Sequence, residues 1–297
     1  MKTKALLFII LAGITWGTSP LFVDYLKDFG ITSLQMTATR SFVSVIILGI
    51  FILFKDRSVF RVKPSELLIF LASGIGYVGT ATFYYQAMQM TSAATSVVLM
   101  YTAPIYVTVF SVAFLGERMT KLKLSSILIM LTGCVLVAGI VGGFKMNLLG
   151  ILFGVLSGIS YSAYNIFTKI AMRRGSDPIS HTFYAFLFAA IVAIAICDPV
   201  DFVSKVSVDP IILTPNLIVF GAVTCVIPYF LYTLAMRDLS AGTACSLGII
   251  EPMAASIFSA VFLSEIPDAF QIVGIVLILG ATVLLSRSES EINKGEL

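Results

Sequence analysis

The sequence predicts an all-α integral membrane protein with ten transmembrane helices, arranged as two inverted-topology repeats of five helices each. Three observations lead to this prediction. Of the 297 residues, 58% are apolar and 12% are charged, whereas soluble domains carry about one quarter charged residues. The apolar residues form long runs, each of which can span about 30 Å of hydrocarbon as a helix. Short motifs also recur in the two halves of the chain.

The ten apolar runs cover residues 5–23, 33–54, 65–88, 93–115, 124–142, 148–171, 179–197, 215–236, 242–263 and 270–286. Lipid offers no hydrogen-bond partners to backbone groups, and the runs are too long for barrel strands, so each is predicted to be a helix. The expected domains are residues 1–143 and 144–287, followed by a short polar tail at 288–297.

The first run follows Lys2 and Lys4, and a charged start before an apolar core is also typical of a secretory signal peptide. This run continues through Pro20 to Val23, however, beyond a plausible cleavage point, and nine more runs follow it. We therefore interpret it as the first helix of the bundle.

The linkers that follow alternate in charge along the chain. Most cations lie before the first helix, in every second linker and in the tail: Lys2, Lys4, Lys55, Arg57, Arg61, Lys63, Arg118, Lys121, Lys123, Arg173, Arg174, Arg237, Arg287 and Lys294. The opposite linkers carry only Lys27, Lys145 and Lys205. The positive-inside rule then places both termini in the cytoplasm and the protein in the inner membrane. The net charge of +3 reflects this orientation, and no nucleic-acid partner is predicted.

The two halves share residues at a constant spacing. Residues 13–17 of the first helix (GITWG) reappear 145 positions later as residues 158–162 (GISYS). In the fourth and ninth helices, Pro104 and Glu117 are echoed 148 positions later by Pro252 and Glu265. Because each half has an odd number of helices, the second copy is inverted, as in many secondary transporters. Such symmetry makes alternating access available as a mechanism.

An ordered set of these residues resembles the EamA-like transporters of the drug/metabolite transporter superfamily. The set comprises Trp16-Gly17, Arg40, Tyr84, Ala87, Ser92-Ala93, Pro104 and Glu117, and in the second half Tyr232, Ser240-Ala241, Glu251-Pro252 and Glu265. The resemblance covers nearly the whole chain. It implies export or exchange of amino acids and related metabolites, coupled to protons in some members. It also implies a central cavity lined by helices 1, 3, 4, 6, 8 and 9.

Four prolines are predicted to break helices and to act as gating elements. Pro104 and Pro252 lie within the fourth and ninth helices, where each removes a backbone hydrogen bond and frees the carbonyl four residues earlier. Pro20 and Pro228 do the same in the first and eighth helices. Paired interruptions at corresponding positions of two repeats point to a substrate site. A packing kink without ligand contact is the alternative.

Two charged residues lie well inside apolar runs, where each must find a partner. Glu251 is a candidate for proton coupling, for binding a substrate ammonium group, or for accepting a structural hydrogen bond from a neighbouring helix. Arg40 could bind a substrate carboxylate. Since the family resemblance places the second helix away from the cavity, a structural pairing is the favoured role for Arg40.

Aromatic and polar side chains recur at helical spacing and are predicted to line the substrate site. They are Trp16, Tyr77, Thr80, Tyr84, Tyr101, Tyr161, Asn165, Tyr229 and Tyr232. Tyrosine and tryptophan are also enriched at membrane interfaces, which is the alternative role for each of them. Glu117 and Glu265 are expected to cap the following helix or to pair with a nearby cation.

No enzyme is predicted, and no catalytic, metal or cofactor site. The string Gly74-x-Gly76-x-x-Gly79 matches a dinucleotide fingerprint, but no strand precedes it and it lies within a membrane span. Its glycines, like those at positions 150, 154 and 158, are expected to allow close helix packing.

The sequence thus predicts a secondary active transporter for a small polar metabolite, an amino acid or a related compound, that works in export or exchange. Its expected partners are the small-molecule substrate, membrane lipid and protons as a candidate coupling ion, and the expected assembly is a monomer or homodimer. A channel-like or uniport pathway and a non-transporting receptor or assembly protein are the alternatives.

Overall fold

The computed structural model describes residues 2–138, 147–264 and 267–294, and every regular element in them is helical. The first repeat contains α1 (Lys2–Trp16), α2 (Ser19–Lys27), α3 (Ser33–Lys55), the short 3₁₀-helix η1 (Arg57–Phe60), α4 (Pro64–Met90), α5 (Ala93–Met100), α6 (Ala103–Phe114) and α7 (Lys121–Val137). The second contains α8 (Leu148–Arg173), α9 (Pro178–Ile196), α10 (Pro199–Val206), α11 (Pro210–Gly221), the π-helical segment η3 (Ala222–Val226), α12 (Ile227–Ala235), α13 (Ala241–Leu247), α14 (Ile250–Phe262) and α15 (Ala269–Lys294).

Nine spans within the described residues are long and apolar enough to cross a membrane. The one predicted span outside these nine is the fifth, which corresponds to α7 and which the structure describes over 17 residues. The end predicted for this span, at residues 139–142, lies outside the described residues, as does the predicted domain boundary at 143/144. The linker predicted before residue 215 contains α10, and α11 begins at Pro210. At the other end of the second repeat, α15 continues through Arg287 to Lys294.

Among the described residues, four spans are interrupted, and each interruption lies next to one of the four predicted prolines. Three of these spans consist of two helical pieces, and the fourth consists of α11, η3 and α12. Pro20, Pro104 and Pro228 occupy the first turn of α2, α6 and α12, where a missing backbone N–H costs little. Pro252 follows the break between α13 and α14. The carbonyl of Gly248, predicted to be free, instead accepts the Glu251 amide at 2.9 Å. A backbone hydrogen bond within the same span therefore bridges this break.

The two repeats interlock through glycines at these breaks. A Cβ at Gly158 of α8 would lie 2.8 Å from the Leu99 carbonyl oxygen, beside the gap between α5 and α6. A Cβ at Gly17, directly after α1, would lie 2.5 Å from the Ala254 Cβ on α14. Helices α1 and α8 start the two repeats, and each packs against a broken helix of the other repeat. The two repeats therefore correspond in how their first helices pack as well as in their sequence motifs.

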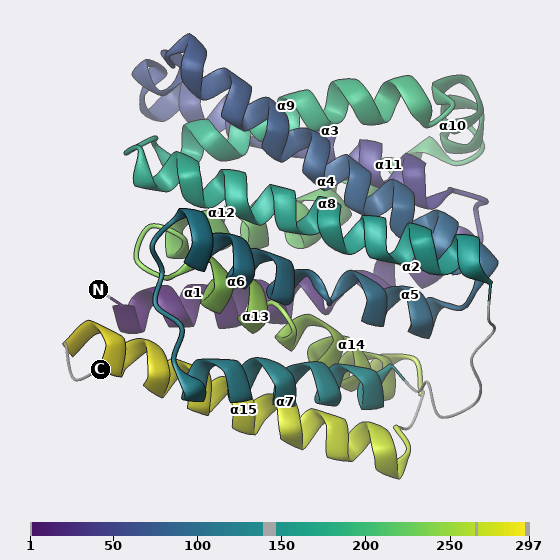
Figure 1. Ribbon diagram of the computed structural model, residues 1–297. Helices are drawn as coiled ribbons and strands as arrows, with labels where there is room; N and C mark the ends of the chain where they lie inside the picture. Colours follow the sequence, from purple (N-terminus) through teal and green to yellow (C-terminus); the bar gives the residue numbers. More distant parts are fainter. Residues whose placement is uncertain (1, 139–146, 265–266, 295–297) are drawn as a thin grey trace.

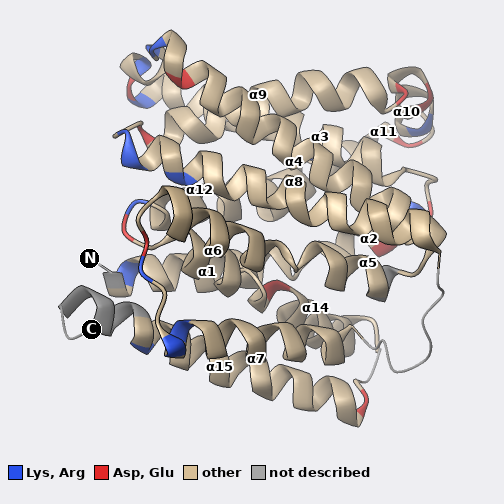
Figure 2. Cartoon of the chain, in the orientation of Figure 1, with Lys and Arg blue, Asp and Glu red and all other residues tan. Residues whose placement is uncertain are grey.

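The helices run side by side along one direction, and both termini lie at the same end of the bundle (Figure 1). We call this the terminal end. Lysine and arginine residues gather mainly at it, while most of the helix length lacks charged residues (Figure 2). Large apolar side chains such as Phe54 and Phe114 are 89% and 74% exposed on the outside of the bundle, as expected of a surface that faces lipid.

Contacts between the two repeats close the terminal end. The Glu117 Oε1 atom accepts a hydrogen bond from the Ala241 amide at 2.7 Å, and so caps the start of α13. The Lys123 ammonium donates to the Ser240 hydroxyl at 2.9 Å and lies 3.8 Å from the Glu117 carboxylate. Lys123 is 1% exposed. These four residues, Glu117, Lys123, Ser240 and Ala241, are referred to below as the terminal-end latch.

The latch corrects the prediction for Glu117 in one respect. The carboxylate does cap a helix and pair with a cation, but the helix is α13 of the other repeat rather than the following helix α7, whose cap is Thr120. Glu265 lies outside the described residues. At the opposite end, Gln35 of α3 donates to Asp201 of α10 at 2.7 Å. Hydrogen bonds from Lys205 and Gln35 lower the pKa of the Asp201 carboxyl group.

Candidate functional site

A cavity of about 710 Å³ lies between the two repeats. Its lining residues come from the middle of the bundle, such as Tyr77 and Glu251, and continue to residues near the end opposite the termini, such as Ser33 and Gln271. The terminal-end latch does not line it. The cavity therefore extends from mid-span toward the end opposite the termini.

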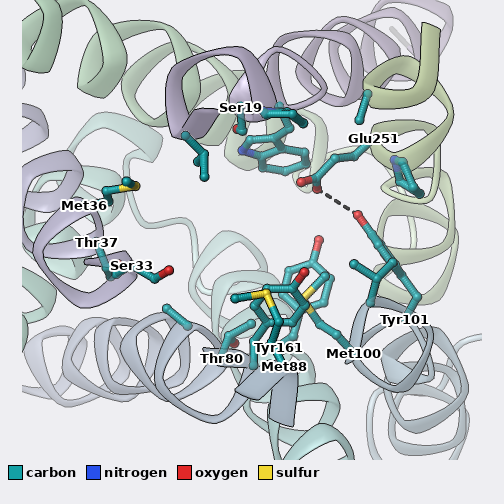
Figure 3. Close-up of a pocket in the computed structure, with 18 of the residues that line it drawn as sticks. Ser19, Ser33, Met36, Thr37, Thr80, Met88, Met100, Tyr101, Tyr161 and Glu251 are labelled. Carbon is teal, nitrogen blue, oxygen red and sulfur yellow. Dashed lines mark hydrogen bonds between the residues drawn. The ribbon is translucent and has the colours of Figure 1, made fainter. Parts of the chain in front are cut away.

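Most of the predicted site residues line this cavity. They are Trp16, Pro20, Tyr77, Thr80, Tyr84, Tyr101, Tyr161, Tyr229, Glu251 and Pro252. Figure 3 shows Glu251 and Tyr101 on one wall, with Thr80 and Tyr161 on an adjoining one. Side chains chosen for their helical spacing in the sequence therefore face the same cavity, as expected of residues that share one face of a helix.

Glu251 connects the two repeats inside the cavity. Its Oε2 atom accepts a hydrogen bond of 2.8 Å from the Tyr101 hydroxyl (Figure 3). Glu251 lies in the first turn of α14, and Tyr101 occupies the turn between α5 and α6, so the bond joins the two helix breaks. A carboxylate at this depth is costly unless it is hydrogen-bonded or paired. Tyr101 supplies one partner and leaves the rest of the carboxylate available to a solute.

Aromatic rings form one wall of the cavity around Tyr229 of α12. Its ring lies 4.9 Å from Trp16, 5.3 Å from Tyr77 and 5.4 Å from Tyr164, in edge-to-face contacts that aromatic pairs prefer. Because these contacts link α1, α4, α8 and α12, the wall is built from both repeats. It offers ring faces to an apolar part of a solute.

Four predicted site residues lie behind this lining. Asn165 accepts a hydrogen bond from the Tyr232 hydroxyl and donates one of 2.7 Å to the Tyr161 carbonyl, and both Asn165 and Tyr232 are fully buried. The Tyr232 ring lies 5.4 Å from Trp16. Asn165 and Tyr232 therefore support lining residues. Pro104 and Pro228 are also buried and do not line the cavity.

One face of α3 was missed as part of the lining. Ser33, Met36, Thr37 and Arg40 all line the cavity, which contradicts the expectation that this helix lies away from it. Their spacing of three, four and seven residues places them on a single helix face. This spacing, together with a cation inside the span, was the sequence pattern that could have predicted that α3 lines the cavity.

A structural pairing was the favoured role for Arg40, and the described residues offer it no ion-pair partner. No described carboxylate lies within 4 Å of its guanidinium group, and its Nε atom is buried without a hydrogen-bond partner among the described residues. The guanidinium carbon lies 5.9 Å from the centre of the Tyr77 ring and 5.6 Å from that of Phe220. Both distances are within cation–π range.

The site has the features of a binding cavity. Among the described residues, no group of three or more histidine, cysteine, aspartate or glutamate side chains is placed to hold a metal ion. The cavity offers a carboxyl group, a guanidinium group, hydroxyl groups and ring faces, a combination typical of sites for small polar or amphipathic solutes.

Comparisons with known proteins identify the family and agree with the helical architecture. The EamA-like transporter family matches twice, over residues 3–139 and 148–287. An uncharacterized transporter of Archaeoglobus fulgidus is 27% identical over 291 residues, covering 94% of this chain and 95% of its own length. A probable terminal-alkyne amino-acid exporter of Streptantibioticus cattleyicolor is 21% identical, with 96% and 94% covered. A solved crystal structure matches with a TM-score of 0.80 at 19% identity, covering 98% of this chain and 99% of that one, so the fold is shared.

Proposed function

This chain belongs to the EamA-like transporter family, and from that premise we propose that it is a secondary active transporter for a small polar metabolite, an amino acid or a related compound. The proposed cycle is alternating access across the inner membrane, in export or exchange. The proposed topology has ten membrane-spanning helices, with α7 as the fifth and both termini in the cytoplasm. Its membrane-transport character rests on the family and on the multiple apolar spans.

The observation that carries the proposal is a cavity that lies between the repeats and is accompanied by contacts closing one end. Alternating access needs a central site that is open to one side while the other side is shut. The cavity extends away from the termini, and the terminal-end latch joins the repeats on the other side. With cytoplasmic termini, this arrangement corresponds to an outward-facing state. A continuous pore would not need such a closed end.

The size and lining of the cavity support the choice of substrate. A volume of about 710 Å³ lies within the range of small-molecule sites and accommodates an amino acid with its hydration water. Glu251 suits an ammonium group, and the aromatic wall suits an apolar side chain. One relative is named a probable terminal-alkyne amino-acid exporter, which supports the same class of substrate.

Counterflow in proteoliposomes tests the proposal. Vesicles containing the purified protein are loaded with one unlabelled amino acid at a time and diluted into a trace of the same labelled compound. A carrier that alternates between two faces should accumulate label transiently, and the initial rate should saturate with concentration. The matched control is protein-free vesicles prepared in parallel.

Each alternative gives a different result in this assay. Non-saturable flux without transient accumulation would support a channel. The absence of flux for every amino acid and related amine or acid tested, with a monodisperse protein, would contradict the transport proposal and favour a receptor or assembly role.

A further inference from the structure

We propose that Arg40 forms an oxyanion-binding subsite on the α3 wall of the cavity, so that the transported solute carries a carboxylate in addition to a cationic group bound at Glu251. This inference rests on the proposed transport function and deepens it, because it restricts the substrates to zwitterionic solutes. Organic cations, which an aromatic cavity with a single glutamate would otherwise suit, become poor substrates.

The first argument is that Arg40 is incompletely paired inside the bundle. Its Nε atom is buried and lacks an acceptor among the described residues, and no described carboxylate lies within 4 Å of its guanidinium nitrogens. Charged side chains inside membrane spans are normally paired or face a wet cavity, and they mark solute pathways. Arg40 faces the cavity, so a solute is the available source of the missing acceptor.

A second buried donor lines the same cavity without an acceptor. The indole nitrogen of Trp16 has no hydrogen-bond partner in the described part of the chain, and the side chain is 4% exposed. Buried donors in folded proteins are nearly always satisfied. Two unsatisfied donors, from α1 and α3, therefore indicate that the site is built to receive acceptor atoms.

The third argument concerns the ring faces. An aromatic wall beside a carboxylate is a familiar arrangement for binding an organic cation through cation–π contacts. Here the Arg40 guanidinium itself lies over the Tyr77 and Phe220 rings, at 5.9 and 5.6 Å. A second cation near Tyr77 would be repelled by the first. The arginine thus repels cations where the rings would attract them and supplies a positive charge for a carboxylate.

The two charges lie on different walls of the cavity. Ser33, Met36 and Thr37 of α3 face Glu251 and Tyr101 across open space in Figure 3, and Arg40 continues the same α3 face by one turn. Arg40 and Glu251 also act on each other electrostatically without forming an ion pair. A zwitterion placed between them satisfies both charges and leaves the cavity neutral, which neither an amine nor an acid alone can do.

The test compares matched probes on the purified full-length protein. The standard amino acids are screened for thermal stabilisation in detergent, and the best binder is then compared with its decarboxylated amine and its deaminated acid. For phenylalanine these would be phenethylamine and 3-phenylpropionate. The wild-type protein should bind the amino acid about 10- to 100-fold more tightly than the amine, as expected for loss of a charged hydrogen bond.

The variant that tests the residue is Arg40→Gln. It should lose most of the preference for the amino acid over the amine, whereas Arg40→Lys should keep part of it, because the charge remains but the two-pronged geometry is lost. Arg61→Gln is the matched control, since Arg61 is exposed and does not line the cavity. It should bind as the wild type does.

The outcomes separate this inference from the proposed function. If the wild-type protein binds the amine as tightly as the amino acid, or if Arg40→Gln keeps the full preference, the inference is overturned while transport stands. If no amino acid stabilises the wild-type protein or shows counterflow, the proposed function fails as well. Should Arg40→Gln not yield a monodisperse protein, the wild-type comparison and Arg40→Lys still decide the matter.

Discussion

Charged and polar side chains within the spans differ in how far the protein itself satisfies them. The hydroxyls of Thr37, Thr39 and Ser41 on α3 each donate to the carbonyl four residues earlier, at 2.8 Å. Asn165 and Tyr232 satisfy each other. Among the described residues, Glu251 has one hydrogen-bond partner, Tyr101, and Arg40 contacts the rings of Tyr77 and Phe220. Since unsatisfied polar groups are costly in lipid, these two incompletely paired charged groups of the cavity are those assigned to the solute.

The role of Glu251 can be separated from that of its hydrogen bond by a pair of substitutions. Glu251→Gln removes the charge but keeps an oxygen that can accept from Tyr101, so thermal stability should change little while the counterflow rate falls at least about tenfold, the loss expected when a charged contact is removed. Tyr101→Phe keeps the carboxylate and should reduce the rate less than about threefold. Initial counterflow rates and unfolding temperatures measure both effects.

Two results would speak against this assignment. If Tyr101→Phe were as damaging as Glu251→Gln, the carboxylate would be a structural acceptor. Full pH-gradient-driven flux in Glu251→Gln would exclude a proton-coupling role for this residue.

At the level of individual helices, the interrupted spans determine where the site lies. The break between α5 and α6 is packed against the unbroken helix α8 of the other repeat through glycine, at Gly158 beside Leu99. Close approach of backbones is the main means of joining helices in lipid, where burying apolar surface gives little advantage. This break is therefore held by backbone contacts that leave no room for a side chain at Gly158.

This packing predicts a sharp difference between two glycine substitutions. Gly158→Ala places a Cβ 2.8 Å from a backbone oxygen and should destabilise the protein by about 1–3 kcal/mol, as overpacking does. In Gly280→Ala on α15, the Cβ meets no atom within 4 Å, and alanine is the better helix former. Thermal unfolding in detergent should show loss of stability for the first variant only. Equal unfolding temperatures would contradict the close-packed break.

The terminal-end latch is predicted to control which face is closed. In Glu117→Ala, the α13 cap and the contact with Lys123 are lost, so the state open at the terminal end should gain population by about tenfold, the effect of one charged hydrogen bond. Cys245 of α13 is a natural reporter because it is fully buried. With the other three cysteines replaced, its labelling by a maleimide should accelerate in Glu117→Ala.

Lys121→Ala, a change at a nearby exposed position, serves as the control for loss of a surface charge. Unchanged labelling of Cys245 in Glu117→Ala, with the fold intact, would show that the contacts do not restrain opening.

At the scale of the whole molecule, the distribution of charge bears on the proposed orientation. Both termini and most cations lie at the same end of the bundle (Figures 1 and 2). Basic residues beside a span favour the cytoplasmic side. The cavity extends toward the other end, which would then face the outside of the cell.

A reporter fusion checks this topology. Green fluorescent protein joined after Leu297 should fluoresce in cells, and alkaline phosphatase at the same position should be inactive, because the first matures in the cytoplasm and the second does not. The reverse should hold for fusions after Lys205, between the seventh and eighth spans. An active phosphatase at the C-terminus would overturn the proposed orientation.

The sequence alone was sufficient for the family, the helical class, two repeats and most of the lining. Apolar run length, helical spacing and paired prolines are local properties, and lipid leaves the backbone few alternatives to a helix. It was also sufficient to single out Glu251, because a carboxylate within a span is conspicuous in any arrangement of helices.

Only the tertiary structure decided which helices meet. In the structure, the face of α3 that carries Arg40 lines the cavity, Asn165 and Tyr232 lie behind the lining, and Glu117 contacts α13 of the other repeat. A residue's spacing fixes the side of its own helix on which it lies but not the neighbour that this side contacts. That neighbour depends on how residues far apart in the sequence pack together, 67 positions for Asn165 and Tyr232 and 124 for Glu117 and Ala241, which no local pattern contains.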